Sequence, residues 1–421
     1  TVIGYGMPNE GTSDAHSDAI GIEATKETKR NLGWDENKTF YVPEEVYAHF
    51  SASVKNGAKF EAEWNEKVGA YKNANPEKSK TFTTVINNEL PEGWQESLPT
   101  FVDVKPAATR VYSGDVINAL AETIPELFGG SADLGPSNKT DIKSSTSFSA
   151  EDYAGRIMHF GIREHAMGSL MVGMSLHGGI IPFGGTFLTF SDYMRPPIRL
   201  AALSEIQTIF VFTHDSIGLG EDGPTHQSVE HLAALRAVPN LFVVRPADAH
   251  ETSEAWRLAI LRQHAPTVLA LSRQNVMVID RKEFADASGT RKGGYVLAEA
   301  TDGKPKLIII GTGAEIGLAL KTRGALEAEG IPTRVVSMPC TELFDEQDAE
   351  YKESVLPTEV KARMVIEAGV RLGWDKYIGS KGAALTVDKF GASAPASVIF
   401  EKYGFTEENA VSIAKELLKN V

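Results

Sequence analysis

The chain has 421 residues, and its 42 lysines and arginines against 56 aspartates and glutamates give a formal net charge of −14. This acidic balance argues against a nucleic-acid partner, although a local basic pocket for an anionic small molecule stays open. The single cysteine, Cys340, excludes an internal disulfide and a cysteine metal site, which fits a reducing cytoplasm. We find no signal peptide pattern and no apolar run that could span a bilayer, so we expect a cytoplasmic protein without a membrane partner.

The beginning of the chain differs from the rest. The run TVIGYG, from Thr1, predicts a strand at the first residue and suggests a piece of something longer. Residues 35–105 are rich in Lys, Glu, Asn and Pro, and stretches such as GAKFEAEWNEKVGAYKNA have helical spacing. We interpret this region as a connecting segment with exposed helices.

From Thr109 the pattern alternates between helices and strands. TRVYSGDVINALAETI has helical apolar spacing, and helical stretches also separate the short apolar runs that follow. Those runs are RIMHFG, GGIIPFGGTFL, TIFVFTH, LFVVRP and TVLALSR. This alternation predicts a parallel sheet that is covered by helices on both faces.

A second series of the same kind starts near Lys306. KLIIIGTG, PTRVVSMP and ARMVIEAG predict strands, one helix is expected to end at Gly330, and Thr406 is the expected N-cap of a terminal helix. The predicted fold class is therefore α/β, with two doubly wound domains and mainly parallel sheets, divided around residues 281–302. Ligands of open parallel sheets bind beyond the carboxyl ends of the strands, so the residues after each strand are the candidates for a site.

The densest polar cluster, THDSIGLGEDGPTHQSVEH, directly follows the predicted strand TIFVF. It contains His214, Asp222 and His226 among other titratable groups, and its glycines indicate a loop that approaches something closely. A zinc or iron site is one alternative, but no H-E-x-x-H spacing is present. A solvated loop is the other alternative, and the composition favours a functional loop.

Two further motifs lie where a predicted strand meets a helix. In RIMHFGIREHAMGSL, the local sequence favours Glu164 as a solvated acid in the first turn of a helix, with a buried carboxylate facing a ligand as the alternative. Phe187, Phe190 and Tyr193 recur at intervals of three. Core packing is the ordinary interpretation of such a stripe, but it begins at a double glycine where a flat ring could stack.

The remaining candidates are weaker when taken singly. Asp133 and Ser137 lie in GGSADLGPSN, which suits either a turn or an anion site. Arg110 and Arg273 are lone arginines at element edges, and each alone is more typical of a surface cation. GTGAEIG is one residue too long for the dinucleotide fingerprint and lacks the later acid, so we favour a tight turn over nicotinamide binding.

Taken together, these motifs resemble the transketolase family. The resemblance rests on HFGIREHAMG, GGTFLTFSDYMRPPIRLAAL, THDSIGLGEDGPTHQSVEHLAALR, VVRPADAHET and LSRQN, and it extends to TVIGYGMPNEGTSDAH, YVPEEVYAHF, GTGAEI and VSMPCTELFDEQ. It implies thiamine diphosphate as cofactor and transfer of a two-carbon ketol unit from a ketose phosphate to an aldose phosphate. It also implies a homodimer, with the cofactor between the diphosphate-binding domain of one subunit and the pyrimidine-binding domain of the other.

The resemblance also implies a domain for each part of the chain. Residues 1–105 would be the tail of the diphosphate-binding domain and a connecting segment. Residues 106–285 would be the pyrimidine-binding domain, and residues 286–421 the C-terminal domain. A near relative with almost the same motifs is dihydroxyacetone synthase, and deoxyxylulose-phosphate synthase fits less well.

On the cofactor side, the resemblance makes Glu164 the catalytic glutamate that hydrogen-bonds N1′ of the aminopyrimidine. Phe190, with Phe187 and Tyr193, would stack on the pyrimidine ring. Asp133 would lie on the cofactor side of the subunit contact.

On the substrate side, the resemblance makes His226 a catalytic histidine near the reacting carbonyl and Asp222 the reader of the donor's C2 hydroxyl. The cradle for the sugar phosphate would be formed by Arg110, Ser137, His214 and Arg273. His16 would touch both cofactor and substrate, but here it is followed by SDAIG, with Asp18 where the family has a small residue.

The family's metal motif is the larger departure. Family members hold the diphosphate through Mg²⁺ or Ca²⁺ with a Gly-Asp-Gly segment and a later Asn, and TDGKP has no suitable Asn after it. We therefore expect no metal ligand in this chain, weak binding of thiamine diphosphate, and a need for the missing N-terminal domain. The alternative is a non-catalytic fragment or subunit that needs a separate diphosphate-binding chain.

Overall fold

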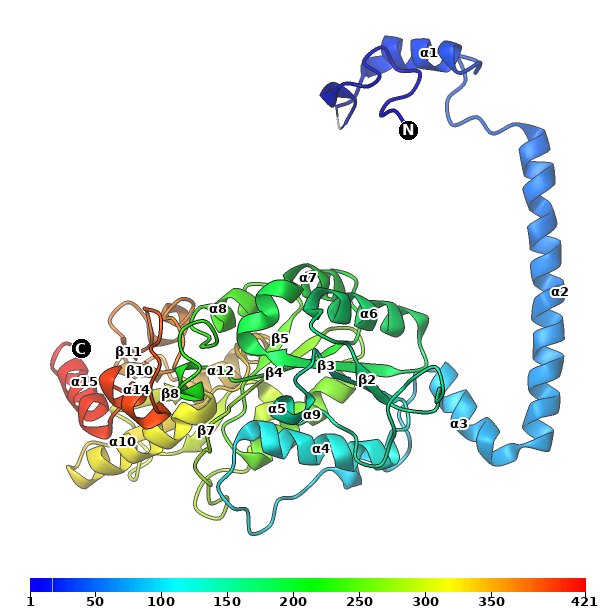
Figure 1. The fold of residues 1–421 in the computed structure, drawn as a ribbon. Helices are drawn as coiled ribbons and strands as arrows, with labels where there is room; N and C mark the ends of the chain where they lie inside the picture. Colours follow the sequence, from blue (N-terminus) through cyan, green and yellow to red (C-terminus); the bar gives the residue numbers. More distant parts are fainter. Residues whose placement is uncertain (17) are drawn as a thin grey trace. The chain divides into compact units, whose positions relative to one another are not determined.

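The computed structural model describes residues 1–16 and 18–421, which divide into two compact units, residues 1–80 and residues 81–421. The first unit is helical (Figure 1), and no residue of its two longest helices is buried. Its elements are η1 (Ser13–Ala15), α1 (Gly21–Asn31), α2 (Glu44–Ala74) and the start of α3 (Pro76–Ile86). The expectation of exposed helices in this part of the chain is confirmed.

The predicted strand at TVIGYG is wrong. Residues 3–6 form turns, in which Gly4 and Gly6 have positive φ values of 66° and 82°. Among the described residues of the first unit there is no other strand to pair with, and a single extended segment would leave its backbone groups unpaired. The amide of Gly11 instead donates to the carbonyl of Ile3.

The first sheet of the second unit has six parallel strands in the order β2-β1-β3-β4-β6-β5. The strands are β1 (Leu127–Ser131), β2 (Ile157–His159), β3 (Ile181–Phe187), β4 (Ile209–Thr213), β5 (Phe242–Val244) and β6 (Thr267–Leu271). Alternate residues face opposite sides, so Val211 packs in one core while Phe210 and Phe212 pack in the other. The parallel sheet predicted for this region is confirmed.

Helices cover both faces of this sheet (Figure 1). α4 (Thr109–Thr123) and α9 (Ala249–Leu261) pack on one face, and α6 (Glu164–His177), α7 (Arg195–Leu203) and α8 (His231–Arg236) pack on the other. The shorter elements are η2 (Trp94–Ser97), α5 (Gly135–Asn138), η3 (Leu188–Met194) and η4 (Ile217–Leu219).

The second sheet has five strands in the order β11-β10-β8-β9-β7, and β7 runs antiparallel to β9. The strands are β7 (Tyr295–Ala298), β8 (Leu307–Gly311), β9 (Thr333–Ser337), β10 (Arg363–Ile366) and β11 (Ala383–Leu385). The helical elements around them are η5 (Ala287–Lys292), η6 (Gly313–Glu315), α10 (Ile316–Ala328), α11 (Thr341–Asp345), α12 (Ala349–Val355), α13 (Asp375–Ile378), α14 (Ala396–Lys402) and α15 (Glu407–Lys419).

The α/β fold class with mainly parallel sheets is therefore confirmed, including the N-cap at Thr406, whose side chain accepts from the amide of Asn409. Strands β1, β7 and β11 were not predicted. Within the described residues, no helix is both long and apolar enough to cross a bilayer.

A buried ion-pair network joins the two sheets. Arg245, which follows β5 and is fully buried, donates from Nε to Asp215 Oδ2 at 2.8 Å and from NH1 to Glu315. The carboxylate of Glu367, which follows β10, accepts hydrogen bonds from both terminal nitrogens of Arg236, at 3.0 and 2.8 Å. These contacts fix the second sheet against the loop that follows β4.

Candidate functional site

The predicted site residues of the second unit gather at the carboxyl edge of the first sheet. Each lies at or after the end of a strand, apart from Arg110 near the start of α4. Asp133 and Ser137 follow β1, Glu164 follows β2, Phe187 ends β3 with Phe190 and Tyr193 after it, His214, Asp222 and His226 follow β4, and Arg273 follows β6. The parallel topology therefore places them along one edge of the sheet.

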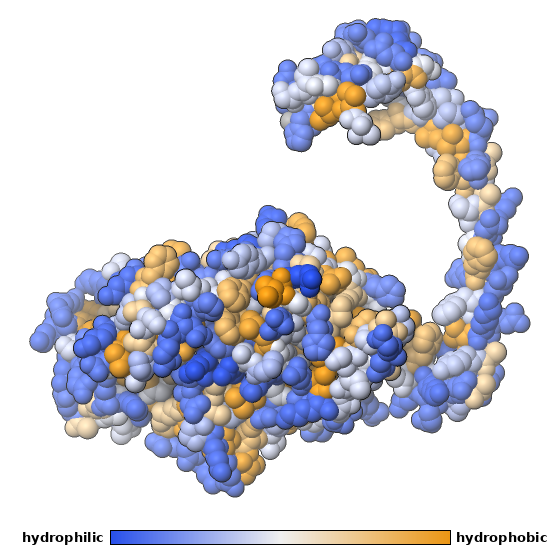
Figure 2. All heavy atoms as spheres, in the orientation of Figure 1, coloured by the Kyte–Doolittle hydropathy of each residue, from blue (hydrophilic) through white to orange (hydrophobic). Residues whose placement is uncertain are grey.

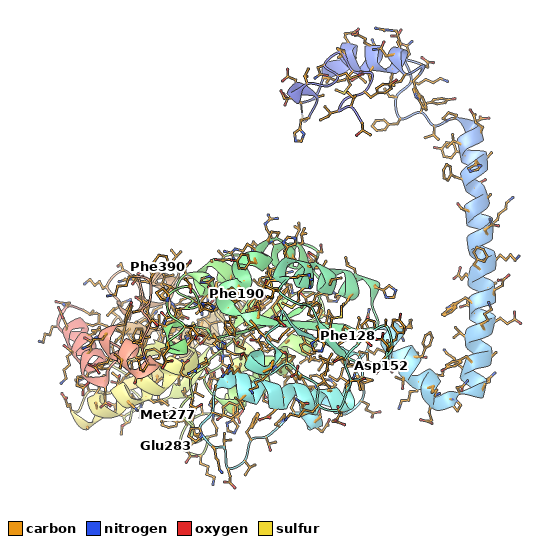
Figure 3. All side chains as sticks on the ribbon, in the orientation of Figure 1. Phe128, Asp152, Phe190, Met277, Glu283 and Phe390 are labelled. Atoms are coloured by element: carbon orange, nitrogen blue, oxygen red, sulfur yellow. The ribbon has the colours of Figure 1, made fainter. Side chains whose placement is uncertain are left out.

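An aromatic and histidine cluster forms the middle of this edge. The Phe187 ring stacks on His214 with centroids 3.6 Å apart, and on Phe190 with centroids 5.8 Å apart and planes 7° apart. Phe190, labelled in Figure 3, also meets His226 edge-on at 5.5 Å. Residues three apart lie on one side of a 3₁₀ helix, and η3 has this geometry, which explains the stripe. Tyr193 continues it at 6.1 Å from Phe190 but is exposed.

His214 is buried at this edge in a left-handed backbone conformation, with φ of 60°. Its Nδ1 lies 2.8 Å from Thr213 Oγ1, and its Nε2 lies 3.5 Å from NH1 of Arg110. Burial, followed by the positive charges of Arg110 and Arg273, lowers the pKa of His214 to about 3. The ring is therefore neutral at physiological pH.

Arg110 has donors that the fold does not use. Its NH1 donates to the carbonyl of Ser137 at 2.6 Å, while its Nε is buried and has no hydrogen-bond partner among the described residues. Burial and the nearby charge of Arg273 lower its pKa. Two arginines, one of which has an unpaired buried donor, could bind an anion here, because a guanidinium can bind phosphate oxygens bidentately.

Glu164 is buried, so the favoured interpretation of a solvated acid is wrong. It is the first residue of α6, it is 9% exposed, and within the described part of the chain its carboxylate makes no hydrogen bond or ion pair. The buried residues of α6 are Glu164, Met167, Gly168 and Met171, which is the spacing of one helix face. That periodicity is visible in the sequence and could have indicated the burial of Glu164.

The other predicted site residues are exposed to solvent. Asp133, in a left-handed conformation with φ of 59°, and Asp222 are both exposed, as is Arg273. His16 belongs to the first unit, where it follows η1 and is exposed, so its role stays a prediction. Asp18 is exposed in the same unit.

Where the structure is described, one group of three side chains could hold a metal ion: Asp192, Glu230 and His231. The two carboxylates are exposed, and His231 Nε2 already lies 3.2 Å from Asp192 Oδ2, as in an ordinary histidine–carboxylate hydrogen bond. The expectation that this chain supplies no metal ligand stays a prediction.

Sequence reasoning missed the buried polar residues behind the cluster. These residues are Asn138, Thr213 and Arg245, and all three are fully buried. Thr213 contacts both His214 and Asn138, and Arg245 contacts Asp215, which follows His214 in the sequence. Thr213 ends a strand and Asn138 ends a turn of helix, so nothing in their local sequence separates them from ordinary element ends.

Comparison with protein families assigns three consecutive regions of the chain. Residues 1–91 match the transketolase thiamine diphosphate binding domain, residues 105–278 the transketolase pyrimidine binding domain, and residues 293–406 the transketolase-like C-terminal domain.

Individual relatives agree. A transketolase of Geobacillus stearothermophilus is 51% identical over 99% of this chain, and a chloroplastic transketolase of Craterostigma plantagineum is 48% identical over 99%. The chain spans 63% of the length of the first and 80% of the second.

Two solved structures are informative. A transketolase from Pichia stipitis in complex with sedoheptulose 7-phosphate has a TM-score of 0.93 and 40% identity, covering all of this chain and 62% of that one. A split-gene transketolase described as an inactive β4 tetramer has a TM-score of 0.59 and 25% identity, covering 75% of this chain and 99% of that one.

Proposed function

The chain belongs to the transketolase family, and from this premise we propose that it acts in thiamine diphosphate-dependent transfer of a two-carbon ketol unit from a ketose phosphate to an aldose phosphate. One observation carries the proposal. The largely buried residue Glu164 with an unpaired carboxylate, a stacked aromatic pair and an arginine with an unused buried donor lie along one edge of one sheet.

The cofactor side of this edge fits an aminopyrimidine. Glu164 has a carboxylate with no partner in the described chain, so it can share a proton with a ring nitrogen. At the same edge of the sheet, Phe190 offers a flat apolar ring that is backed by the buried Phe187, and aromatic rings stack with offset or edge geometry. Bound thiamine diphosphate supplies the carbanion-stabilising chemistry, and the protein supplies binding and orientation.

The substrate side fits a sugar phosphate. Arg110 and Arg273 supply positive charge, and Arg110 offers a buried N–H that the fold leaves free. His226, with Nδ1 2.9 Å from Thr225 Oγ1, lies edge-on to Phe190 and is a candidate to move a proton at the reacting carbonyl. Asp222 would accept from a donor hydroxyl, and the similarity to a structure that contains sedoheptulose 7-phosphate supports this ligand class.

We propose that this chain carries the pyrimidine-side part of the site, on residues 106–285, and that Mg²⁺ or Ca²⁺ is held elsewhere. The family's Gly-Asp-Gly…Asn pattern is not in the sequence, and the matched relatives are longer than the chain. No step is assigned to the metal. The second candidate, a subunit inactive without a separate diphosphate-binding chain, is favoured by the similarity to an inactive split-gene transketolase.

Exposed apolar side chains support a homodimer. Figure 2 shows apolar side chains along α2, where Tyr47, Phe50 and Trp64 are more than half exposed. Leu200 and Leu203 are likewise exposed on α7. Large apolar side chains that stay in water mark surfaces that another chain or domain covers.

The test is ketol transfer by the purified chain, with thiamine diphosphate, Mg²⁺, xylulose 5-phosphate and ribose 5-phosphate. We expect no turnover by the chain alone and turnover after addition of a separately produced diphosphate-binding domain. The Glu164→Gln chain, mixed with the same domain, is the matched control, and its turnover should be about 10²–10⁴-fold lower. Turnover by the chain alone would contradict the half-site proposal, and no turnover in the complemented mixture would contradict the function itself.

A further inference from the structure

A chain of hydrogen bonds lies buried behind His214. Thr213 Oγ1 donates to Asn138 Oδ1 at 2.7 Å, and Asn138 Nδ2 donates to Ser131 Oγ at 3.1 Å. Ser131 Oγ lies 2.6 Å from Thr140 Oγ1. Thr213, Asn138 and Thr140 are fully buried, so water does not compete for these bonds.

The number of protons available to this series of hydrogen bonds determines the tautomer of His214. A threonine hydroxyl has one proton, and that of Thr213 is used by Asn138. Thr213 Oγ1 must therefore accept from His214 Nδ1, which lies 2.8 Å away. A neutral imidazole has one N–H, so Nε2 is left with a lone pair, which faces the NH1 donor of Arg110 at 3.5 Å.

We propose that Thr213 and Asn138 are positioning residues that hold the proton of His214 on Nδ1, so that a phosphate bound at this edge places a second proton on Nε2. The proposal rests on the function given above, because it concerns the sugar phosphate of that reaction.

The reason is the direction of the hydrogen bond at Nε2. A bare Nε2 presents a lone pair to a phosphate oxygen, and two acceptors repel each other. One proton between them removes the conflict. It comes from solvent when the phosphate enters as a dianion, or from the phosphate itself when it enters as a monoanion. In both cases only one N–H bond forms, and the product is an imidazolium beside a dianion.

Burial first, and then the charges around the ring, explain why the proton is absent before the phosphate arrives. Arg110 from α4, Arg273 after β6 and His226 from the loop after β4 act electrostatically on His214, and all three disfavour a second proton on its ring. Together with burial they hold its pKa at about 3. A phosphate dianion at this edge offsets the positive charge of the two arginines and favours the imidazolium.

The test is a long-range ¹H–¹⁵N correlation spectrum of the whole chain labelled with ¹⁵N-histidine, at about pH 6.5, where a phosphate monoester is mainly a dianion. A His214→Asn spectrum assigns the signals. We expect the free protein to show protonated Nδ1 and unprotonated Nε2. Addition of ribose 5-phosphate should protonate Nε2.

Matched variants separate positioning from packing. Thr213→Val removes the acceptor at Nδ1, so part of the His214 population should carry its proton on Nε2 before any ligand is added, although Arg110 NH1 opposes this tautomer. Thr213→Ser should retain the proton on Nδ1. Asn138→Asp should keep the wild-type tautomer, because a carboxylate can only accept from Thr213. Asn138→Leu frees the hydroxyl and should lose the fixed tautomer.

The outcomes are distinct. A free wild-type protein with protonated Nε2, or a Thr213→Val protein with an unchanged tautomer, would overturn the positioning role. Nε2 that stays unprotonated while His214 shifts on addition of ribose 5-phosphate would overturn the proton uptake. A His214 signal that does not change on addition of ribose 5-phosphate would contradict the phosphate site, and with it the proposed function. In that case the tautomer of the free protein would still decide the role of Thr213 and Asn138.

Discussion

The two sheets of the second unit use polar residues at their carboxyl edges in opposite ways. After the strands of the second sheet, Glu315 and Glu367 turn inward and meet Arg245 and Arg236. At the carboxyl edge of the first sheet, Glu164 has no partner in the described chain, and Arg110, near the start of α4, has an unused buried donor. Opposite charges that meet inside the fold hold it together, whereas a carboxylate and a guanidinium without a charge partner at the carboxyl edge of a sheet are available to a ligand.

The same contrast explains the glycine-rich turn after β8. A Cβ on Gly313, which has φ of 58°, would lie 2.8 Å from the Arg245 guanidinium carbon. The amide of Gly313 also donates to the carbonyl of Arg245 at 3.1 Å. The motif GTGAEIG is thus a tight turn that makes room for Arg245, in agreement with the interpretation favoured from the sequence.

The largest effect on stability is expected at the inward-facing edge. Arg245→Met leaves Asp215 and Glu315 buried without their cation, and breaking such a network costs about 3–5 kcal/mol. Denaturant unfolding measures the loss. Arg371→Met is the control, because the exposed pair of Arg371 with Asp375 should contribute less than about 1 kcal/mol. Equal losses in the free energy of unfolding of the two variants would show that the inward-facing network does not stabilise the fold more than a surface ion pair does.

Glu164→Gln should behave in the opposite way. The side chain has no partner within the described residues, so the free energy of unfolding should stay the same or rise, since a neutral amide is cheaper to bury than a carboxylate. Ketol transfer by the complemented protein should fall about 10²–10⁴-fold, which is the range for loss of an acid–base group. A destabilised variant with normal turnover would show that Glu164 is structural.

His214 should make the fold sensitive to acid. Its pKa is about 3 in the folded protein, against an ordinary value of 6.5, so between these pH values the unfolded chain binds the extra proton. Stability should therefore rise with pH across this window and fall as the solution is acidified from pH 6.5 toward 3. The midpoint of urea unfolding, followed across the window, should depend less on pH in His214→Asn than in the wild type. Identical slopes would mean that the ring titrates normally.

Two glycine substitutions should give the smallest effects and opposite signs. Gly313→Ala forces a side chain against Arg245 in a left-handed conformation and should cost about 1–3 kcal/mol. Gly324→Ala, within α10 and with nothing near its added methyl group, should stabilise by about 0.5–1 kcal/mol. Thermal unfolding of the two variants distinguishes them, and stabilisation by Gly313→Ala would be the contrary result.

The sequence was sufficient to predict the helices and strands with periodic apolar residues, and the edge of the sheet where the candidate residues gather. The strands before His214 and Arg273 are apolar runs bounded by polar turns, and parallel topology then brings their ends together. β1 was missed because its sequence, LFGGS, has little β propensity; a Cβ on Gly129 would collide with the carbonyl of Phe183 on the neighbouring strand. Arg245 and Asn138 could not be placed, because their partners lie 30 to 75 positions away in the chain.

Calorimetric titration of the chain with ribose 5-phosphate, and separately with ribose, is the most direct test of the claim that unpaired groups at the first edge form a phosphate site. Arg110→Met should abolish binding, and Arg199→Met, which removes an exposed arginine of α7, should leave it unchanged. The account predicts that the wild-type chain binds the phosphate ester and not the free sugar. Equal binding of the two sugars, or binding that survives Arg110→Met, would contradict it.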